Sequence, residues 1–295
     1  MSDSGYHPSL DDPNAYVLYR YRPSLPAAII FVIAFAITTF WHCWQCGRTR
    51  TWYFIPLIIG GFFEWVGYIG RALSSQDQWT LGPFIQQSLL LLVAPALFAA
   101  SIYMILGRII LVTDGEQHSL IRQKWLTKVF VTGDVISFLV QAGGAGIMSA
   151  GSASSMHTGE KIVVAGLFIQ LAFFGFFIIV GSLFYSRISQ HPTAKSAIDD
   201  GTMPWRKHFW VLMGASALVF VRSVFRVIEY LMGNNGYLLK HEVFLYIFDA
   251  VLMFAVMALF NVVHPSEITR MLKANDRREV GMEEIRERYM EGDSA

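Results

Sequence analysis

Seven apolar stretches, each about as long as a bilayer-crossing helix, run through this chain of 295 residues. A helix crosses the hydrocarbon core with about 20 residues that carry few charges. The segments between the stretches are short and rich in charge, Gly or Pro, so none of them holds a soluble domain. The sequence therefore predicts an all-α fold, a seven-transmembrane-helix bundle that forms one membrane domain at residues 25–264. The expected spans are residues 25–44, 53–73, 83–107, 129–149, 162–185, 209–230 and 243–263.

The composition agrees with a bilayer as the main solvent. Only 15% of the residues are charged and 54% are hydrophobic, whereas soluble domains carry about a quarter charged residues. No basic patch lies beside an aromatic platform, so the sequence gives no support to nucleic-acid binding. Two cysteines are too few for a disulfide framework or a four-cysteine zinc site. We expect no cofactor.

The distribution of Lys and Arg predicts the orientation. Of the 23 basic residues, sixteen fall in the connections on one side of the membrane, five fall on the other side, and two lie inside the sixth span. The side rich in Lys and Arg is cytosolic in multi-pass proteins. We therefore expect residues 1–24 to form an extracellular N-terminal tail and residues 265–295 a cytosolic C-terminal tail.

Charged residues inside the expected spans are the main functional signal, because such residues are costly in a membrane and face the bundle interior. Glu64 lies near the middle of the second span, and Arg71 follows seven residues later on the same helix face. Arg222, Arg226 and Glu229 are spaced four and three apart, so they form one stripe on the sixth span. These residues are expected to pair, since an unpaired buried charge is far more costly.

Polar residues of three further spans complete the candidate site. Tyr246 and Asp249 belong to the seventh span. Asp134 and Gln141 share one face of the fourth span, nearer the cytosolic exit, and Gln170 belongs to the fifth. Together with the charged residues of the second and sixth spans, they form the predicted intramembrane ligand site.

Two interpretations of these buried charges remain open. They could pair only with one another and fix the register of the helices. Alternatively, they could line a polar cavity, open to the outer side, that holds the head group of an amphiphile while its apolar part lies between helices. Arg suits a carboxylate or phosphate, whereas Glu64 or Asp249 could receive an amine.

A catalytic metal site has little support in the sequence. His42, His208 and His264 fall near cytosolic helix ends, and no pair has the spacing His-x-x-x-His. Histidines at helix ends are usually interfacial or capping residues. We expect no metal site, no catalytic residue and no enzyme activity.

Read in order, the polar positions resemble the fungal lipid-translocating exporter family, the RTA-like proteins named for resistance to aminocholesterol. The resemblance covers about residues 21–265. Its most specific elements are Glu64-x-x-Gly67-Tyr68-x-x-Arg71, Asp134-x-x-Ser137-x-x-x-Gln141, Arg222-x-x-x-Arg226-x-x-Glu229 and His264-Pro265.

The resemblance implies a translocator or exporter of lipids or amphiphiles, such as sphingoid long-chain bases, sterol-like or porphyrin-like compounds, that confers tolerance to them. No segment suits ATP hydrolysis. Two alternatives stay open, a seven-helix lipid sensor that signals through the cytosolic tail and a membrane-embedded metal-dependent lipid hydrolase. The expected partners are an amphiphilic small molecule and the bilayer, with the plasma membrane favoured over an internal one.

Overall fold

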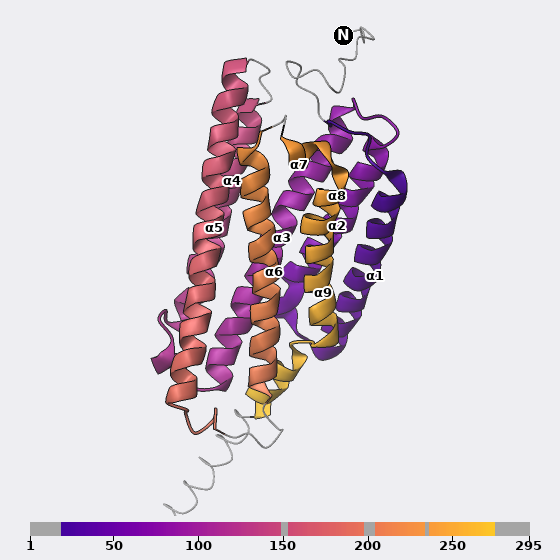
Figure 1. Cartoon of the computed structure of the whole chain (residues 1–295). Helices are drawn as coiled ribbons and strands as arrows, with labels where there is room; N and C mark the ends of the chain where they lie inside the picture. The colour runs from indigo at the N-terminus through magenta and orange to yellow at the C-terminus, as the bar shows by residue number, and fades with distance from the viewer. Residues whose placement is uncertain (1–18, 149–152, 198–203, 234–235, 275–295) are drawn as a thin grey trace, which may run out of the picture.

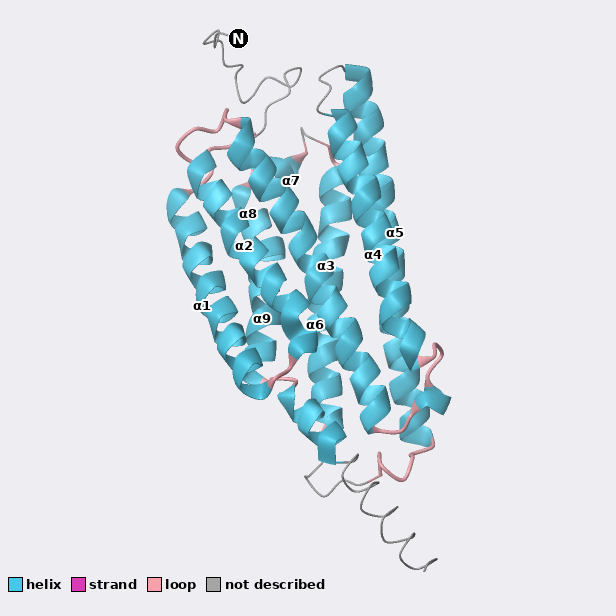
Figure 2. Ribbon diagram, turned by 180° about the vertical axis from the view of Figure 1, so that it is seen from behind, coloured by secondary structure: helices cyan, strands magenta, loops and turns pink. Residues whose placement is uncertain are grey.

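A computed structural model describes residues 19–148, 153–197, 204–233 and 236–274 of the chain. These residues form helices and connections, with no strand among them (Figures 1 and 2). Seven of the helical segments are long and apolar enough to cross a membrane. The predicted fold class is confirmed: the part of the chain that is described forms an all-α bundle with seven candidate membrane spans.

The first six spans are single long helices. They are α1 (Leu25–Thr49), α2 (Ile55–Ser74), α3 (Leu81–Val112), α4 (Gln123–Met148), α5 (Ala153–Gln190) and α6 (Trp205–Leu231). Two short 3₁₀ turns lie in the connections, η1 (Trp52–Phe54) before α2 and η2 (Glu116–His118) before α4.

The seventh span is built from several pieces. A short helix, α7 (Tyr237–Lys240), precedes α8 (Glu242–Leu245), the π-helical turn η3 (Tyr246–Val251) and α9 (Leu252–Val262). The helix breaks at residues 263–265 and resumes over residues 266–274, at the start of the expected C-terminal tail. Residues 275–295 of that tail lie outside the described residues.

Most helices extend beyond the expected spans. At 1.5 Å per residue, the 38 residues of α5 measure about 57 Å, well beyond the hydrocarbon core of about 30 Å. The apolar stretches mark only the lipid-contacting middle of each helix, so their ends do not predict where the helix begins or stops. Ser149, the expected end of the fourth span, lies outside the described residues.

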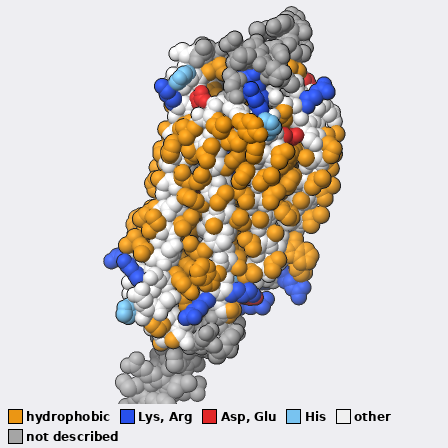
Figure 3. All heavy atoms as spheres, in the orientation of Figure 1, with side chains coloured by type: hydrophobic (Ala, Val, Ile, Leu, Met, Phe, Trp, Pro, Cys, Tyr) orange, Lys and Arg blue, Asp and Glu red, His pale blue; other side chains and the backbone are white. Residues whose placement is uncertain are grey.

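The outer surface of the bundle is apolar along its middle and charged at its ends (Figure 3). Large hydrophobic side chains such as Ile30, Ile37 and Leu139 are each more than half exposed. In water this surface would be unfavourable, whereas in lipid it has no cost, because lipid tails are as apolar as leucine. The exposed apolar middle is the part that contacts the bilayer.

The helices pack in a ring that α3 and α6 close across the middle. Successive helices from α1 to α6 are neighbours, α9 packs against both α6 and α1, and α3 contacts α6 directly. The half of the bundle away from Tyr19 is filled by aromatic side chains, with Phe98, Tyr103, Phe177 and Phe260 almost completely buried. We call the end at which residues 19–24 lie the N-terminal end of the bundle and the other the opposite end.

Helices α4 and α5 approach each other most closely through glycine. A Cβ atom on Gly144 would lie 2.7 Å from the carbonyl oxygen of Gly159 and 2.8 Å from the backbone nitrogen of Val163. By contrast, a Cβ on the neighbouring Gly143 would meet nothing within 4 Å. Small residues at helix interfaces permit such backbone contact, and in this pair only Gly144 is needed for it.

These two glycines provide a matched test of the packing. We expect Gly144→Ala to push α4 from α5 and lower the free energy of unfolding by about 1–3 kcal/mol, the usual cost of overpacking. Gly143→Ala should leave stability unchanged or raise it slightly. Thermal unfolding of the two variants in the same detergent measures the difference, and equal melting temperatures would contradict the close contact.

Candidate functional site

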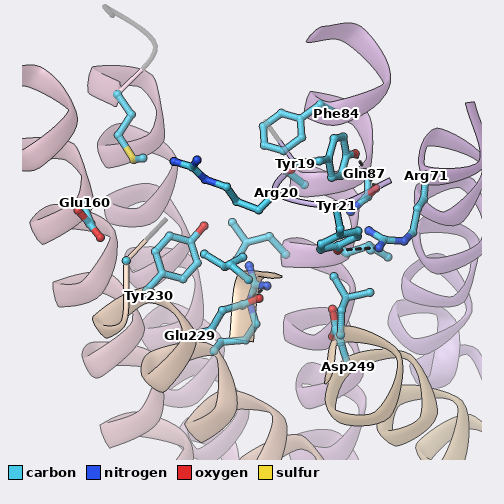
Figure 4. Close-up of a pocket in the computed structure, with 18 of the residues that line it drawn as sticks. Tyr19, Arg20, Tyr21, Arg71, Phe84, Gln87, Glu160, Glu229, Tyr230 and Asp249 are labelled. Carbon is cyan, nitrogen blue, oxygen red and sulfur yellow. Dashed lines mark hydrogen bonds and ion pairs between the residues drawn. The ribbon is translucent and has the colours of Figure 1, made fainter. Parts of the chain in front are cut away.

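A polar cavity of about 210 Å³ lies inside the bundle near its N-terminal end (Figure 4). Residues of the helices from α2 to α8, of η3 and of the N-terminal segment surround it. Its walls combine aromatic and aliphatic side chains with charged ones. The charged residues that line it are Arg20, Arg71, Glu160, Arg222, Arg226, Glu229 and Asp249.

An ion pair between α6 and the seventh span forms the floor of the cavity. The Arg222 guanidinium donates through Nε to the Asp249 carboxylate. Both side chains are only 4% exposed. Such a pair, removed from water, is strong only when its remaining donors and acceptors are also satisfied.

The second donor of Arg222 binds α3. Its Nη2 atom donates to the backbone carbonyl of Leu91 at 2.7 Å. Four residues later stands Pro95, which has no N–H to donate to that carbonyl within the helix. Pro95 thus frees an acceptor in the middle of a membrane helix, and Arg222 uses it. Three spans, α3, α6 and the seventh, meet at this one guanidinium.

The π-helical turn η3 determines where Asp249 lies. In a regular α-helix, Glu242, Tyr246 and Asp249 would share one face. In the structure Glu242 and Tyr246 contact Arg71 of α2, whereas Asp249 contacts Arg222 of α6. The wider i→i+5 turn rotates Asp249 away from the other two, and π turns of this kind are frequent at functional sites.

A second ion pair lies along α6 itself. Arg226 Nη1 is 2.5 Å from Glu229 Oε2, and the Arg226 guanidinium lies 5.3 Å from the centre of the Tyr230 ring. The Arg226 side chain is 17% exposed and that of Glu229 only 4%. Both residues line the cavity, and Arg226 is the more exposed of the two.

Arg71 is the most completely buried charged side chain of the site, at 0% exposure. Its Nη2 atom lies 2.7 Å from both Glu242 Oε1 and the Tyr21 hydroxyl, and its Nε donates to the Tyr246 hydroxyl at 3.0 Å. The sequence predicted pairing among Glu64, Arg71 and the charges of the last two spans. The structure instead pairs Arg71 with Glu242, an acid outside the predicted site.

The last residues before α1 close over this cluster. The Ser24 backbone N–H donates to both carboxylate oxygens of Glu242, at 2.9 and 3.0 Å. The Tyr19 hydroxyl donates to Gln87 Oε1 at 3.0 Å, and the ring packs edge-on against Phe84. Burial raises the pKa of Tyr19 and of Tyr21, with Arg71 opposing the shift, so both hydroxyls are neutral at physiological pH. Residues 19–24 were expected to be tail, yet they form one wall of the site.

Glu64 lies behind the cavity and does not line it. Its side chain is 2% exposed, and its electrostatic neighbours are Asp249 and Arg222. Among the described residues its Oε1 atom accepts no hydrogen bond. One turn later on α2, the Tyr68 hydroxyl is buried in the same way, and its ring stacks on Phe35 of α1.

The other predicted residues lie elsewhere between the helices. Asp134 accepts a hydrogen bond from the Tyr103 hydroxyl at 3.0 Å, among the aromatic side chains of the opposite half. Gln141 donates to Ser137 at 2.8 Å and to Gln170 at 3.2 Å, between α4 and α5. These groups join neighbouring helices, and none of Asp134, Gln141 and Gln170 lines the cavity.

The three histidines considered for a metal site lie near the opposite end. His42 and His264 have ring centres 6.3 Å apart, and His208 Nε2 is 2.8 Å from Glu267 Oε2. In the parts of the chain that are described, no three His, Cys, Asp or Glu side chains come together so as to hold a metal ion.

Several residues of the site escaped prediction from the sequence. Tyr19, Tyr21 and Glu160 lie outside the expected spans, and Gln87 has a polar position on α3 but no charge. Glu242 carried a usable signal, since it stands one turn before Tyr246 and next to the expected start of the seventh span. Its pairing with a residue 171 positions away could not be read from spacing.

The described residues form seven membrane-length helices around a cavity with charged walls. This arrangement defines an integral multi-pass membrane protein with a polar site between its helices. The chain belongs to the RTA1-like family, because the model of that family, "RTA1 like protein", matches residues 57–271. The resemblance noted in the sequence is confirmed.

Relatives of known name extend over most of the chain. Protoporphyrin uptake protein 1 of Saccharomyces cerevisiae is 38% identical over 284 residues, which cover 84% of this chain and 92% of that protein. Protein RTA1 of the same yeast is 37% identical, covering 85% and 86%. Sphingoid long-chain base transporter RSB1, also of Saccharomyces cerevisiae, is 26% identical, covering 82% and 72%. No solved structure matches this chain.

The Arg71 cluster generates a stability prediction. Glu242→Gln keeps the shape of the side chain but leaves a fully buried guanidinium without its counter-charge, which costs about 3–5 kcal/mol. We expect a clear fall in melting temperature in detergent. Lys240→Gln, an exposed change two residues earlier, is the control and should have no effect. Unchanged stability of Glu242→Gln would show that the pair does not hold the N-terminal end together.

Proposed function

We propose that the protein moves amphiphilic molecules across the membrane and binds their polar head groups in the cavity at the N-terminal end. The observation that carries this proposal is the cavity itself, a space lined by ion pairs within an otherwise apolar membrane bundle. Ion pairs that only fixed the register of helices would be packed without free volume. Here Arg222, Asp249, Arg226 and Glu229 all line open space.

The lining suits a molecule with one polar and one apolar part. Charged groups cluster around Arg222 and Arg226, whereas Phe84, Leu91, Leu92 and Leu245 supply apolar wall. Binding sites for small molecules commonly combine a largely apolar lining with a few placed polar groups. At about 210 Å³ the cavity accommodates a head group, and the tail of the amphiphile would extend between helices into lipid.

The names of the relatives support the same class of cargo. One is named for protoporphyrin uptake and another for transport of sphingoid long-chain bases. Both kinds of molecule combine charged groups with a large apolar body. We infer that this chain carries an amphiphile of this general type and confers tolerance to it, without hydrolysing ATP itself, since helices and short connections make up the described residues.

We also propose that the cavity faces the outside of the cell. Among the described residues, most Lys and Arg of the connections lie at the opposite end, and the positive side of a multi-pass protein is cytosolic. The aromatic core of that half closes the path towards the cytosol. The structure then corresponds to an outward-open state, and movement of cargo requires a second, inward-open one.

Two neighbouring residues of α3 offer a test. Ser88 lines the cavity, whereas Leu89 is 40% exposed on the outer surface and does not line it. Ser88→Trp should fill the cavity and reduce flux of a fluorescent long-chain base into liposomes at least tenfold. Leu89→Trp, which adds the same ring towards lipid, should leave flux near the wild-type rate.

The comparison requires that both variants purify as folded protein with similar melting temperatures. Equal flux through wild type, Ser88→Trp and Leu89→Trp would remove the cavity from the transport path. Absence of flux from the folded wild-type protein would contradict translocation and favour a lipid sensor.

A further inference from the structure

Two buried carboxyl groups share one arginine behind the floor of the cavity. Asp249 forms the ion pair with Arg222, and the Glu64 carboxyl, from α2, has these same two groups as its electrostatic neighbours. Both Glu64 and Asp249 are almost completely buried. Among the described residues, Glu64 Oε1 accepts no hydrogen bond. Since Glu64 and Asp249 are two acids and Arg222 is one base, full ionisation of all three would leave a net charge of minus one.

The charges of the surrounding elements do not correct this imbalance. On α2, Arg71 is bound to Glu242, and on α6, Arg226 is bound to Glu229. Helix α3 contributes the Leu91 carbonyl, to which Arg222 already donates a hydrogen bond.

The remaining neighbours bring no charge. Tyr68, on α2, and Tyr246, on η3, carry phenolic hydroxyls, which are ordinarily neutral at physiological pH. Helix α1 contributes the rings of Phe31 and Phe35, which stack on Tyr68. Among the described residues, Arg222 is the one cation that interacts with both Glu64 and Asp249.

A buried carboxylate without a counter-charge is so costly that such a group takes up a proton instead. When two carboxyls compete for one cation, one ionises and the other stays neutral. Asp249 holds the hydrogen bond with Arg222, so the neutral member is Glu64. The missing hydrogen-bond donor at Glu64 Oε1 agrees with this, because a neutral carboxyl tolerates a poor environment better than an ionised one.

We propose that Glu64, Asp249 and Arg222 together hold one exchangeable proton, and that an ammonium head group entering the cavity displaces it. This inference rests on the proposed function, since it identifies long-chain amines as one cargo and protons as the opposing ion. Asp249 lines the cavity, so an ammonium beside it supplies the second positive charge. Glu64 then ionises against Arg222, and its proton passes to water in the cavity.

The exchange balances in charge and atoms. The O–H bond of the Glu64 carboxyl breaks, the proton leaves as hydronium, and the ammonium keeps its own proton. One positive charge enters as one departs, so the step is electroneutral. Across a membrane, a tenfold difference in proton concentration could therefore sustain a tenfold difference in the amine, which gives the protein an energy source other than ATP.

The resting proton can be tested without any transport. Infrared spectroscopy of the purified full-length protein at neutral pH should show the C=O band of a protonated carboxyl that is lost in Glu64→Gln. The band should also be lost in Asp249→Asn, because Glu64 then ionises to pair with Arg222. Asp134→Asn, which changes a buried acid elsewhere in the bundle, is the control and should retain it. A spectrum unaffected by Glu64→Gln overturns the proposal.

Stability gives a second readout of the same pair. Glu64→Gln mimics the neutral carboxyl and should leave the melting temperature nearly unchanged, and Asp249→Asn should be partly compensated by Glu64. The double variant leaves Arg222 without any counter-ion, so its loss of stability should exceed the sum of the two single losses. Additive effects would show that the two acids do not share Arg222.

Proton displacement is measured with sphingosine as the probe. In weakly buffered detergent, binding should release close to one proton per sphingosine, and none with Glu64→Gln. A long-chain alcohol of equal length, which has no charge, should release none. Sphingosine that binds wild type without proton release overturns the exchange.

The two proposals fail in different ways. Flux into liposomes without opposing proton movement would leave translocation intact and remove the proton exchange. Proton release on binding together with no flux would retain the proton site and contradict translocation.

Discussion

The architecture around the cavity depends on a single guanidinium. Arg222 binds the Asp249 carboxylate of the seventh span and the Leu91 carbonyl of α3, so three membrane helices meet at one side chain. The carbonyl is available because Pro95 provides no N–H, and the carboxylate is in reach because the π turn η3 rotates it towards α6. At the depth of the membrane an unpaired carbonyl or carboxylate is costly. Two departures from regular helix geometry therefore satisfy one buried charge.

A second buried arginine organises the end of the bundle. Arg71 is fully buried and joins α2 to the seventh span through Glu242, and to the N-terminal segment through Tyr21. Because Ser24 also binds Glu242, the entry into α1 is attached to the same cluster. Arg71, Arg222 and Arg226 all line the cavity, and each is paired with an acid. Arg71 and Arg222 therefore connect helices and also face the space that a ligand would occupy.

The sequence predicted the seven spans and five of the cavity-lining charges, because charge exclusion from lipid and helical periodicity act over short distances along the chain. The stripe of Arg222, Arg226 and Glu229 is an example. Pairing across distant helices escaped prediction, since it depends on how each helix is rotated about its axis. The π turn separated Asp249 from Tyr246 although their spacing places them on one face, and no residue pattern marks that turn. Residues 19–24 were predicted to be a polar tail, because the residues that they bind lie on helices distant in the sequence.

Photolabelling shows directly whether the cavity receives the head group of an amphiphile. A long-chain base with a photoreactive group beside its amine is activated in membranes that contain the full-length protein, and the labelled residues are identified by mass spectrometry. We expect labels on the cavity faces of α3 and α6, around Ser88 and Tyr230, that disappear with excess unlabelled base. Labels confined to the lipid-facing groove of α1, around Phe40 and Trp44, would contradict it.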